Sequence, residues 1–274
     1  MTPPATDDSE DLELAVEGTA QLAGQIARSR TITVLTGAGI STESGIPDFR
    51  GPQGLWTRNP AAESMFTYDK YVSDPEVRRQ AWENRRTNAT WDAEPNAGHL
   101  ALVDLERSGR LLALLTQNVD ELHQRAGSAP ETVVELHGTL HQVECLRCGK
   151  RYPMPDILAR VEQGEPDPTC ERCGGMLKSA TIAFGQPLDL EVLERASVAA
   201  QRCDLFLAIG SSLSVHPAAG FCDVAVRAGA RLVVLNAEPT PYDESARASG
   251  GMVLRAPIGQ VLPGAVRTAL SQPA

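Results

Sequence analysis

The stretch from Thr31 to Gly51, TITVLTGAGISTESGIPDFRG, decides the fold of this chain. Its first five residues, Thr31 to Leu35, are β-branched or aliphatic, which is typical of a strand buried in a parallel sheet. Gly37 and Gly39 follow, where the chain must turn tightly and let its backbone approach a ligand. The usual dinucleotide fingerprint has a third glycine three residues after the second, but Thr42 stands there. The glycines alone therefore leave two alternatives open, a dinucleotide site and a plain turn.

The residues after the glycines favour a ligand site. Pro47 stops any helix, and Asp48, Phe49 and Arg50 then place an anion, an aromatic ring and a guanidinium side by side. Arg50 can contact a pyrophosphate or a carboxylate, and Phe49 can shield a reactive centre from water. A plain surface loop rarely needs that set of side chains.

This stretch resembles the signature of the sirtuins, the Sir2 family of NAD-dependent protein deacylases, GAGxSxxSGIPDFR, and the resemblance is to the bacterial type. Four further blocks agree with it, so that the resemblance covers roughly residues 26–238. It implies that NAD is bound by the residues of the glycine turn and its sequel: Gly37, Ala38, Gly39, Ser41, Asp48, Phe49 and Arg50.

Length and composition bound the fold and the partners. The chain has 274 residues, of which 42% are hydrophobic, so it can bury a sizeable core. Its formal charge of −10 disfavours nonspecific binding to nucleic acid or to an anionic membrane, but tolerates a cationic substrate segment. The first residues, MTPPATDDSEDLE, do not resemble a signal peptide, and no apolar run approaches the ~20 residues of a membrane span. We therefore expect a cytoplasmic protein without nucleic-acid or membrane partners.

Aliphatic runs near residues 31, 111, 133, 205 and 232 predict strands, and helical patterns lie between them. This alternation predicts an α/β fold, a doubly wound Rossmann-like parallel sheet with a small zinc-ribbon and helical domain inserted. We expect NAD and peptide to meet between the two domains. The predicted division is a disordered tail over 1–10, a Rossmann-like NAD-binding domain over 11–59, 92–142 and 179–274, and a small domain made of a helical layer over 60–91 and a zinc-ribbon module over 143–178.

Polar side chains follow the predicted strand over 111–115. In open α/β sheets, ligands bind outside the carboxyl ends of the strands, so Gln117, Asn118 and Asp120 can hydrogen-bond the ribose and carboxamide of a nicotinamide nucleotide. Asn118 and Asp120 could equally cap the next helix. The block TQNVD resembles the one that holds the nicotinamide end in sirtuins, with Gln117 near the ribose, and this resemblance favours the functional interpretation.

His137 directly follows the short predicted strand over 133–136, on the same sheet edge as Gly37 and Asn118. Imidazole titrates near neutral pH, which makes His137 a candidate general base. The block VELHG resembles the catalytic histidine motif of the sirtuins. We assign structural roles to the other four histidines, His99, His123, His141 and His216.

Two C-x-x-C pairs, Cys145 with Cys148 and Cys170 with Cys173, are separated by a length typical of a zinc ribbon. Four thiolates leave no open coordination position, so the predicted zinc is structural and holds the insertion together. A redox pair and a nucleic-acid-binding ribbon are the alternatives. The insertion is not strongly basic and has no row of aromatic residues, which argues against the second.

Two later strand ends complete the predicted NAD site. Gly210, Ser211 and Ser212 suit phosphate or ribose contacts, although a simple turn with a helix cap would use the same residues. Asn236 and Glu238 could hold the adenosine ribose. The resemblance assigns the first three to NAD. Relatives commonly carry Cys-Asp near residue 252, where this chain has Gly-Met.

The resemblance also assigns Val215 and Gly185 to an extended substrate peptide that pairs as an added strand. Gln186 stands where most sirtuins have Glu, which predicts a weaker preference for cationic residues around the target lysine. Sirtuins that prefer acidic acyl groups share Tyr-x-x-Arg in the helical layer, and this chain offers Trp82 and Arg85 there. We interpret Arg85 as a solvated helix charge rather than a carboxylate ligand, and expect acetyl-lysine to be preferred over succinyl-lysine.

The resemblance implies a deacetylase that consumes NAD and acts on acyl-lysine proteins or peptides. The acyl oxygen attacks the ribose carbon as nicotinamide leaves, and His137 accepts a proton from a ribose hydroxyl. Asn118 assists at the nicotinamide end, and the products are lysine, nicotinamide and O-acyl-ADP-ribose. The alternatives are a mono-ADP-ribosyltransferase, a deacylase for longer or acidic acyl groups, and a non-catalytic NAD-sensing module.

Overall fold

The computed structural model describes residues 8–52, 54–58 and 67–272. Within these ranges the main sheet has six parallel strands in the order β3-β2-β1-β7-β8-β9. The chain runs outward from β1 to β3 and returns to the other side of β1 with β7, so the order reverses between β1 and β7. The strands are β1 (Ile32–Thr36), β2 (Leu111–Thr116), β3 (Val133–Glu135), β7 (Leu205–Ile209), β8 (Arg231–Leu235) and β9 (Met252–Leu254).

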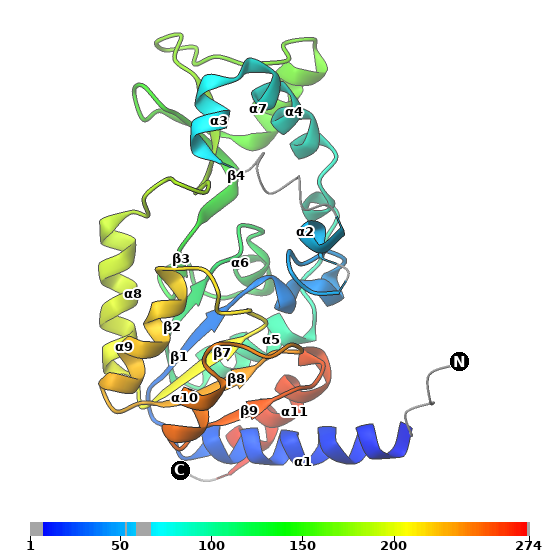
Figure 1. The fold of residues 1–274 in the computed structure, drawn as a ribbon, viewed down its shortest axis with the longest axis vertical. Coiled ribbons are helices and arrows are strands. Elements are labelled where there is room, and N and C mark those ends of the chain that lie inside the picture. The colour runs from blue at the N-terminus through cyan, green and yellow to red at the C-terminus, as the bar shows by residue number, and fades with distance from the viewer. Residues whose placement is uncertain (1–7, 53, 59–66, 273–274) are drawn as a thin grey trace.

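Helices cover both faces of this sheet (Figure 1). One face packs on α1 (Asp8–Ala27), α5 (Ala97–Arg107) and α11 (Ile258–Ser271), and α6 (Leu122–Ala126) adjoins α5. The opposite face packs on α8 (Leu190–Arg202), the short helix η4 (Ala218–Gly220), α9 (Phe221–Arg227) and α10 (Asp243–Ala248). The fold is therefore the doubly wound α/β layer structure that the alternation of strands and helices predicts.

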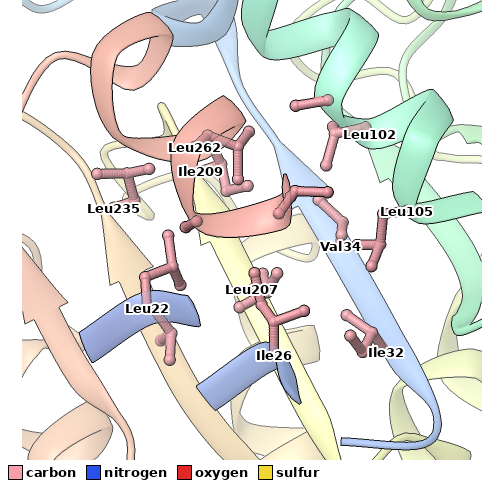
Figure 2. Close-up of a cluster of buried hydrophobic side chains, with 14 of the residues drawn as sticks. Leu22, Ile26, Ile32, Val34, Leu102, Leu105, Leu207, Ile209, Leu235 and Leu262 are labelled. Atoms are coloured by element: carbon pink, nitrogen blue, oxygen red, sulfur yellow. The ribbon is translucent and has the colours of Figure 1, made fainter. Parts of the chain in front are cut away.

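The first of these two cores shows why the aliphatic runs become strands. Figure 2 shows Ile32 and Val34 of β1 in one cluster with Leu22 and Ile26 of α1 and with Leu102 and Leu105 of α5. These side chains are buried. Burial of an aliphatic side chain contributes about 1.5–3 kcal/mol, which fixes both the strand register and the helix orientation.

A second, smaller body lies at one end of the molecule (Figure 1). Its antiparallel sheet has the order β5-β4-β6, and a separate core holds Trp82, Val143 and Leu177. Its elements are α3 (Tyr68–Ser73), α4 (Pro75–Arg86), β4 (Gly138–Cys145), β5 (Arg151–Pro153), α7 (Met154–Glu162) and β6 (Leu177–Thr181). The chain links the two bodies through α2 (Leu55–Arg58) and the short helix η3 (Ala89–Trp91). The predicted domain boundaries stay a prediction.

Several elements differ from the expectation. The predicted tail over 1–10 overlaps α1, which begins at Asp8, and residues 1–7 lie outside the described part of the chain. Residues 60–66 of the predicted helical layer lie outside it as well. β9 was not predicted, because three residues are too few for a periodicity.

The structure contradicts the interpretation of Arg85 as a solvated charge. Its guanidinium donates to Ala81 O at 2.8 Å and to Ser179 Oγ at 2.7 Å, and lies 5.6 Å from the centre of the buried Trp82 ring. Burial lowers the pKa of this guanidinium. The reason is that α4 lays this face on the small-domain core, which its sequence of alternating charges does not reveal. In the described part of the chain, no helix is long and apolar enough to cross a membrane.

Gly251 offers a test of how tightly β8 and its neighbours pack. A Cβ built at Gly251 would lie 1.8 Å from Leu232 O, a backbone atom that cannot rotate away. Gly251→Ala should therefore lower the free energy of unfolding by about 3 kcal/mol. The control is Gly24→Ala in α1, where a Cβ meets nothing within 4 Å. It should raise stability by about 0.5–1 kcal/mol. Urea unfolding compares both, and a Gly251→Ala protein as stable as the parent would contradict the packing.

Candidate functional site

The site begins where the turns after β1 and β7 interlock. Gly37 N donates to Ile209 O at 3.0 Å, and Gly39 N donates to Gly210 O at 2.8 Å. A Cβ at Gly37 would lie 2.7 Å from Gly210 O, and one at Gly39 would lie 2.8 Å from Gly210 Cα. Gly210 itself has φ +62. The glycines are thus required because two turns touch each other at the point where strand order reverses, which is the place where doubly wound sheets bind ligands.

The loop after Gly37 forms the short helix η1 (Ala38–Ser44). Two supports hold it. Asn96, which caps α5, donates Nδ2 to Ile40 O at 2.7 Å and to Ser44 Oγ at 3.0 Å. Glu43 accepts a hydrogen bond from Gly259 N at 2.9 Å, at the start of α11, where the N-cap Pro257 supplies no side-chain cap.

Sequence reasoning missed both supports. Neither Asn96 nor Glu43 was given a role in the site. Their partners lie 56 and 216 positions away along the chain, respectively. The capping pattern at Asn96 was a usable signal for the helix, but no local pattern predicts a contact across such a separation.

Three buried polar side chains meet beside the glycine turn. Ser41 Oγ donates to Asp120 Oδ2 at 2.7 Å, and Asn118 Nδ2 donates to Ser41 Oγ at 3.1 Å and to Gly37 O at 3.2 Å. Asp120 Oδ1 accepts from Leu122 N at 3.0 Å. One carboxylate oxygen therefore binds the start of α6, and the other binds Ser41 beside the glycine turn.

His137 lies at the end of β3, on the same sheet edge. Its Nδ1 is 3.0 Å from Gln117 O, and a carbonyl oxygen only accepts, so Nδ1 carries the hydrogen. In the neutral ring, Nε2 then holds the lone pair that can take a proton. Burial lowers the pKa of His137 below 6.5, and the hydrogen bond from Nδ1 to Gln117 O opposes this shift. The imidazole is thus neutral at neutral pH, as a general base must be.

Gln117 also joins the ends of β2 and β7, because its Nε2 donates to Ser211 Oγ at 2.7 Å. The structure therefore brings together nine of the predicted residues at the neighbouring ends of β1, β2, β3 and β7, where hydrogen bonds join them in three groups, with Ala38 and Ser212 in the two turns beside them. These nine residues are Gly37, Gly39, Ser41, Gln117, Asn118, Asp120, His137, Gly210 and Ser211.

The other predicted cofactor residues have different partners. Asp48 Oδ1 accepts from Gly51 N at 3.0 Å within its own loop, next to Phe49 and Arg50. Asn236 Nδ2 donates to Glu238 O at 2.8 Å in the turn after β8, one strand beyond β7. Among the described hydrogen bonds of Asp48 and Asn236, none reaches the network around His137.

The two residues assigned to a peptide follow different sheets. Val215 lies in the turn after β7 and accepts from Ala219 N at 2.9 Å. Gly185 lies after β6, has φ +82 and is exposed. Phe184 O beside it accepts from Tyr68 N at 2.9 Å, so this segment runs along the start of α3.

The four cysteines of the two C-x-x-C pairs converge. All four Sγ atoms lie within 4.8 Å of one another, with 3.5 Å between Cys145 and Cys173 and 3.7 Å between Cys148 and Cys170. A tetrahedral zinc with bonds of about 2.3 Å places its sulfurs about 3.8 Å apart, so the cluster fits zinc. A Cβ at Gly175 would lie 2.9 Å from Cys145 Sγ, so only glycine lets the cluster close.

Comparisons with known proteins agree with this geometry. The Sir2 family profile matches residues 37–217. The chain is 55% identical over 236 residues to NAD-dependent protein deacetylase 2 of Streptomyces coelicolor (strain ATCC BAA-471 / A3(2) / M145), covering 86% of this chain and 96% of that protein.

Two solved structures are similar as well. One is a Sir2 variant with a deacetylated p53 peptide and 3'-O-acetyl ADP-ribose, at a TM-score of 0.80 and 34% identity, covering 88% of this chain and 94% of that one. The other is Sir2 with a p53 peptide and NAD+, at a TM-score of 0.77 and 35% identity, covering 87% and 93%. The interlocked glycine turns, the His137 network and these similarities together establish that the chain belongs to the Sir2 family.

Proposed function

We propose that this chain is an NAD-dependent protein lysine deacetylase, which transfers the acetyl group of acetyl-lysine to ADP-ribose and releases nicotinamide. The observation that carries the proposal is the hydrogen bond between His137 Nδ1 and Gln117 O, at 3.0 Å. It fixes a neutral imidazole at the strand edge where Asn118 and Asp120 also lie. Two relatives, at 55% and 45% identity, are named for that activity.

NAD supplies the ADP-ribose that accepts the acyl group. His137 takes the proton of a ribose hydroxyl at Nε2, and burial favours the neutral ring that can do so. Asn118 and Asp120 orient the nicotinamide end, and Gln117 lies near the ribose. The remaining contacts to NAD come from Gly37, Ala38, Gly39, Ser41, Asp48, Phe49, Arg50, Gly210, Ser211, Ser212, Asn236 and Glu238.

The acyl-lysine peptide lies between Val215 and Gly185 and adds a strand there. This arrangement places the peptide between the NAD-binding domain and the small domain, with the boundaries stated above. Cys145, Cys148, Cys170 and Cys173 hold a structural zinc, whose contribution is to stabilise the small domain. We assign the activity to the cytoplasm, because free thiols suited to zinc persist in a reducing compartment.

The central test is mass spectrometry of an acetyl-lysine peptide incubated with NAD. O-acetyl-ADP-ribose should form only when NAD is present. His137→Ala should reduce turnover by at least about a thousandfold, because the variant lacks the general base, while zinc content and thermal unfolding stay unchanged. Label from NAD retained on protein, without peptide deacetylation, would instead identify a mono-ADP-ribosyltransferase. Binding of NAD without nicotinamide release would identify a sensing module.

The state of His137 predicts the pH dependence of the reaction. Burial lowers its pKa below 6.5, so the base is mostly neutral at neutral pH and becomes protonated as the pH falls. We expect kcat/KM to be level near neutral pH and to fall on the acid side, with a midpoint below 6.5. A pH profile of kcat/KM for the peptide, with NAD binding measured at the same pH values, checks this. An acid-side midpoint above 7 would rule out a buried, neutral His137 as the base.

The surroundings of Arg85 predict the acyl preference. Its guanidinium is engaged by Ala81 O and Ser179 Oγ and packs against Trp82, so it is not poised for a substrate carboxylate. Acetyl-lysine peptide should therefore exceed its succinyl-lysine counterpart in kcat/KM by about tenfold or more, because a buried succinyl carboxylate would lack a partner. Faster turnover of the succinylated peptide would show that Arg85 reorients toward the substrate.

A further inference from the structure

The segment after His137 runs beside the loop that carries Asn118 and Asp120. It contacts that loop at successive positions rather than at one point. The contacts are His137 Nδ1 with Gln117 O at 3.0 Å, Leu140 N to Val119 O at 2.9 Å, His141 Nε2 with Asp120 O at 3.1 Å, and Thr139 Oγ1 to Glu121 Oε1 at 2.6 Å. The loop is thus attached along its length to the start of β4.

Glu121 is the exceptional residue of this loop. Its φ of 57 is left-handed, a conformation that costs free energy for a residue other than glycine. Its side chain accepts from Thr139 Oγ1, whose residue is buried, and Oε2 lies 3.8 Å from His141 Nδ1. These contacts to β4 offset the backbone cost. Because Glu121 directly follows Asp120, they also fix the direction in which the Asp120 carboxylate points.

His141 fixes the same peptide from the other side. Asp120 O can only accept, so His141 Nε2 carries the hydrogen of this bond. The Trp91 ring packs edge-to-face against the His141 imidazole, with ring centres 5.2 Å apart, and holds it in place. The strand that presents His141 ends at Cys145 in the four-cysteine cluster, so β4 is anchored at its far end as well.

We propose that Thr139, His141 and Glu121 are positioning residues that hold Asp120 and Asn118 in place for the nicotinamide end of NAD. This inference rests on the proposed function. The carboxylate of Asp120 binds Ser41 Oγ, which in turn accepts from Asn118. Loosening the backbone at Asp120 therefore disturbs the nicotinamide side of the site, whereas the peptide segments near Val215 and Gly185 contact none of these three residues in the described hydrogen bonds.

The test compares Thr139→Val and His141→Phe with the parent protein. Each should raise the KM for NAD and the inhibition constant of nicotinamide by about tenfold, because one partly buried hydrogen bond is lost. The KM for the acetyl-lysine peptide should stay within about twofold, since its contacts are untouched. The matched control is Glu144→Gln on the same strand, whose carboxylate pairs with Arg151 at 3.5 Å on the surface and should leave every constant unchanged.

A rescue separates positioning from general stability. His141→Gln keeps an N–H donor that can reach Asp120 O, and should restore most of the affinity for NAD that His141→Phe loses. Glu121→Gly accepts a φ of 57 without strain but lacks the carboxylate, and should still weaken NAD binding. Zinc content and thermal unfolding are measured for every variant.

Equal rises in both KM values, or an unchanged KM for NAD in Thr139→Val and His141→Phe, would overturn the proposal. If Thr139→Val or His141→Phe does not fold, the KM values for NAD of Glu121→Gly and His141→Gln test the proposal instead. Calorimetric binding of NAD and of nicotinamide to the same variants does not depend on turnover. It therefore tests the proposal even if the parent protein deacetylates no peptide, and so separates this proposal from the proposed function.

Discussion

The close contact between the turn after β1 and the turn after β7 is the constraint on which the site depends. Gly37, Gly39 and Gly210 bring backbone against backbone, with no room for a Cβ at any of the three. Because the turns touch, Gly37 O comes within 3.2 Å of Asn118 Nδ2 on the neighbouring strand end. A side chain at any of these glycines would separate the turns and move the two halves of the sheet edge apart. The glycines therefore act first on the protein itself, and a ligand meets an edge that is already assembled.

Burial gives this edge its chemical character. Thr36 Oγ1 contacts both Thr116 Oγ1 and His123 Nε2 at 2.9 Å, beneath the turns, and His123 lies 4.9 Å from the ring of His99. Burial lowers the pKa of His99 to about 4 and that of His123 well below 6.5, so both rings are neutral at neutral pH. These two rings therefore add no positive charge, and the carboxylate oxygens of Asp120 bind Ser41 Oγ and Leu122 N. The hydrogen bonds of Asp120 to Ser41 Oγ and Leu122 N rigidify this edge, since moving one of these groups leaves another buried without its partner.

Local sequence patterns predicted the strands and the motif residues, and missed the side-chain contacts between residues far apart in the chain. Aliphatic runs placed β1, β2, β7 and β8, because burial on both faces of a parallel sheet demands continuous apolar sequence. The four cysteines and His137 were predicted because their chemistry demands particular residues at particular spacings. Glu43 caps α11, and Arg85 donates to Ser179 Oγ. Both partners are distant in the sequence, so no local pattern predicts these contacts. His141 was predicted as structural, and only its contact with Asp120 O shows what it supports.

The zinc-ribbon segment of the small domain is short, which limits how it can fold. A segment as short as 143–178 buries too little apolar surface to fold by itself, and chains below about 40 residues usually need a metal or disulfides. The four-cysteine cluster meets that need at one end of β4. At the other end, a Cβ at Gly138 would lie 2.0 Å from Ala180 O, so the backbone of β6 packs directly against the residue that follows His137. A single strand, held by sulfur at one end and by close backbone contact at the other, therefore sets where His137 and the Asp120 loop lie relative to each other.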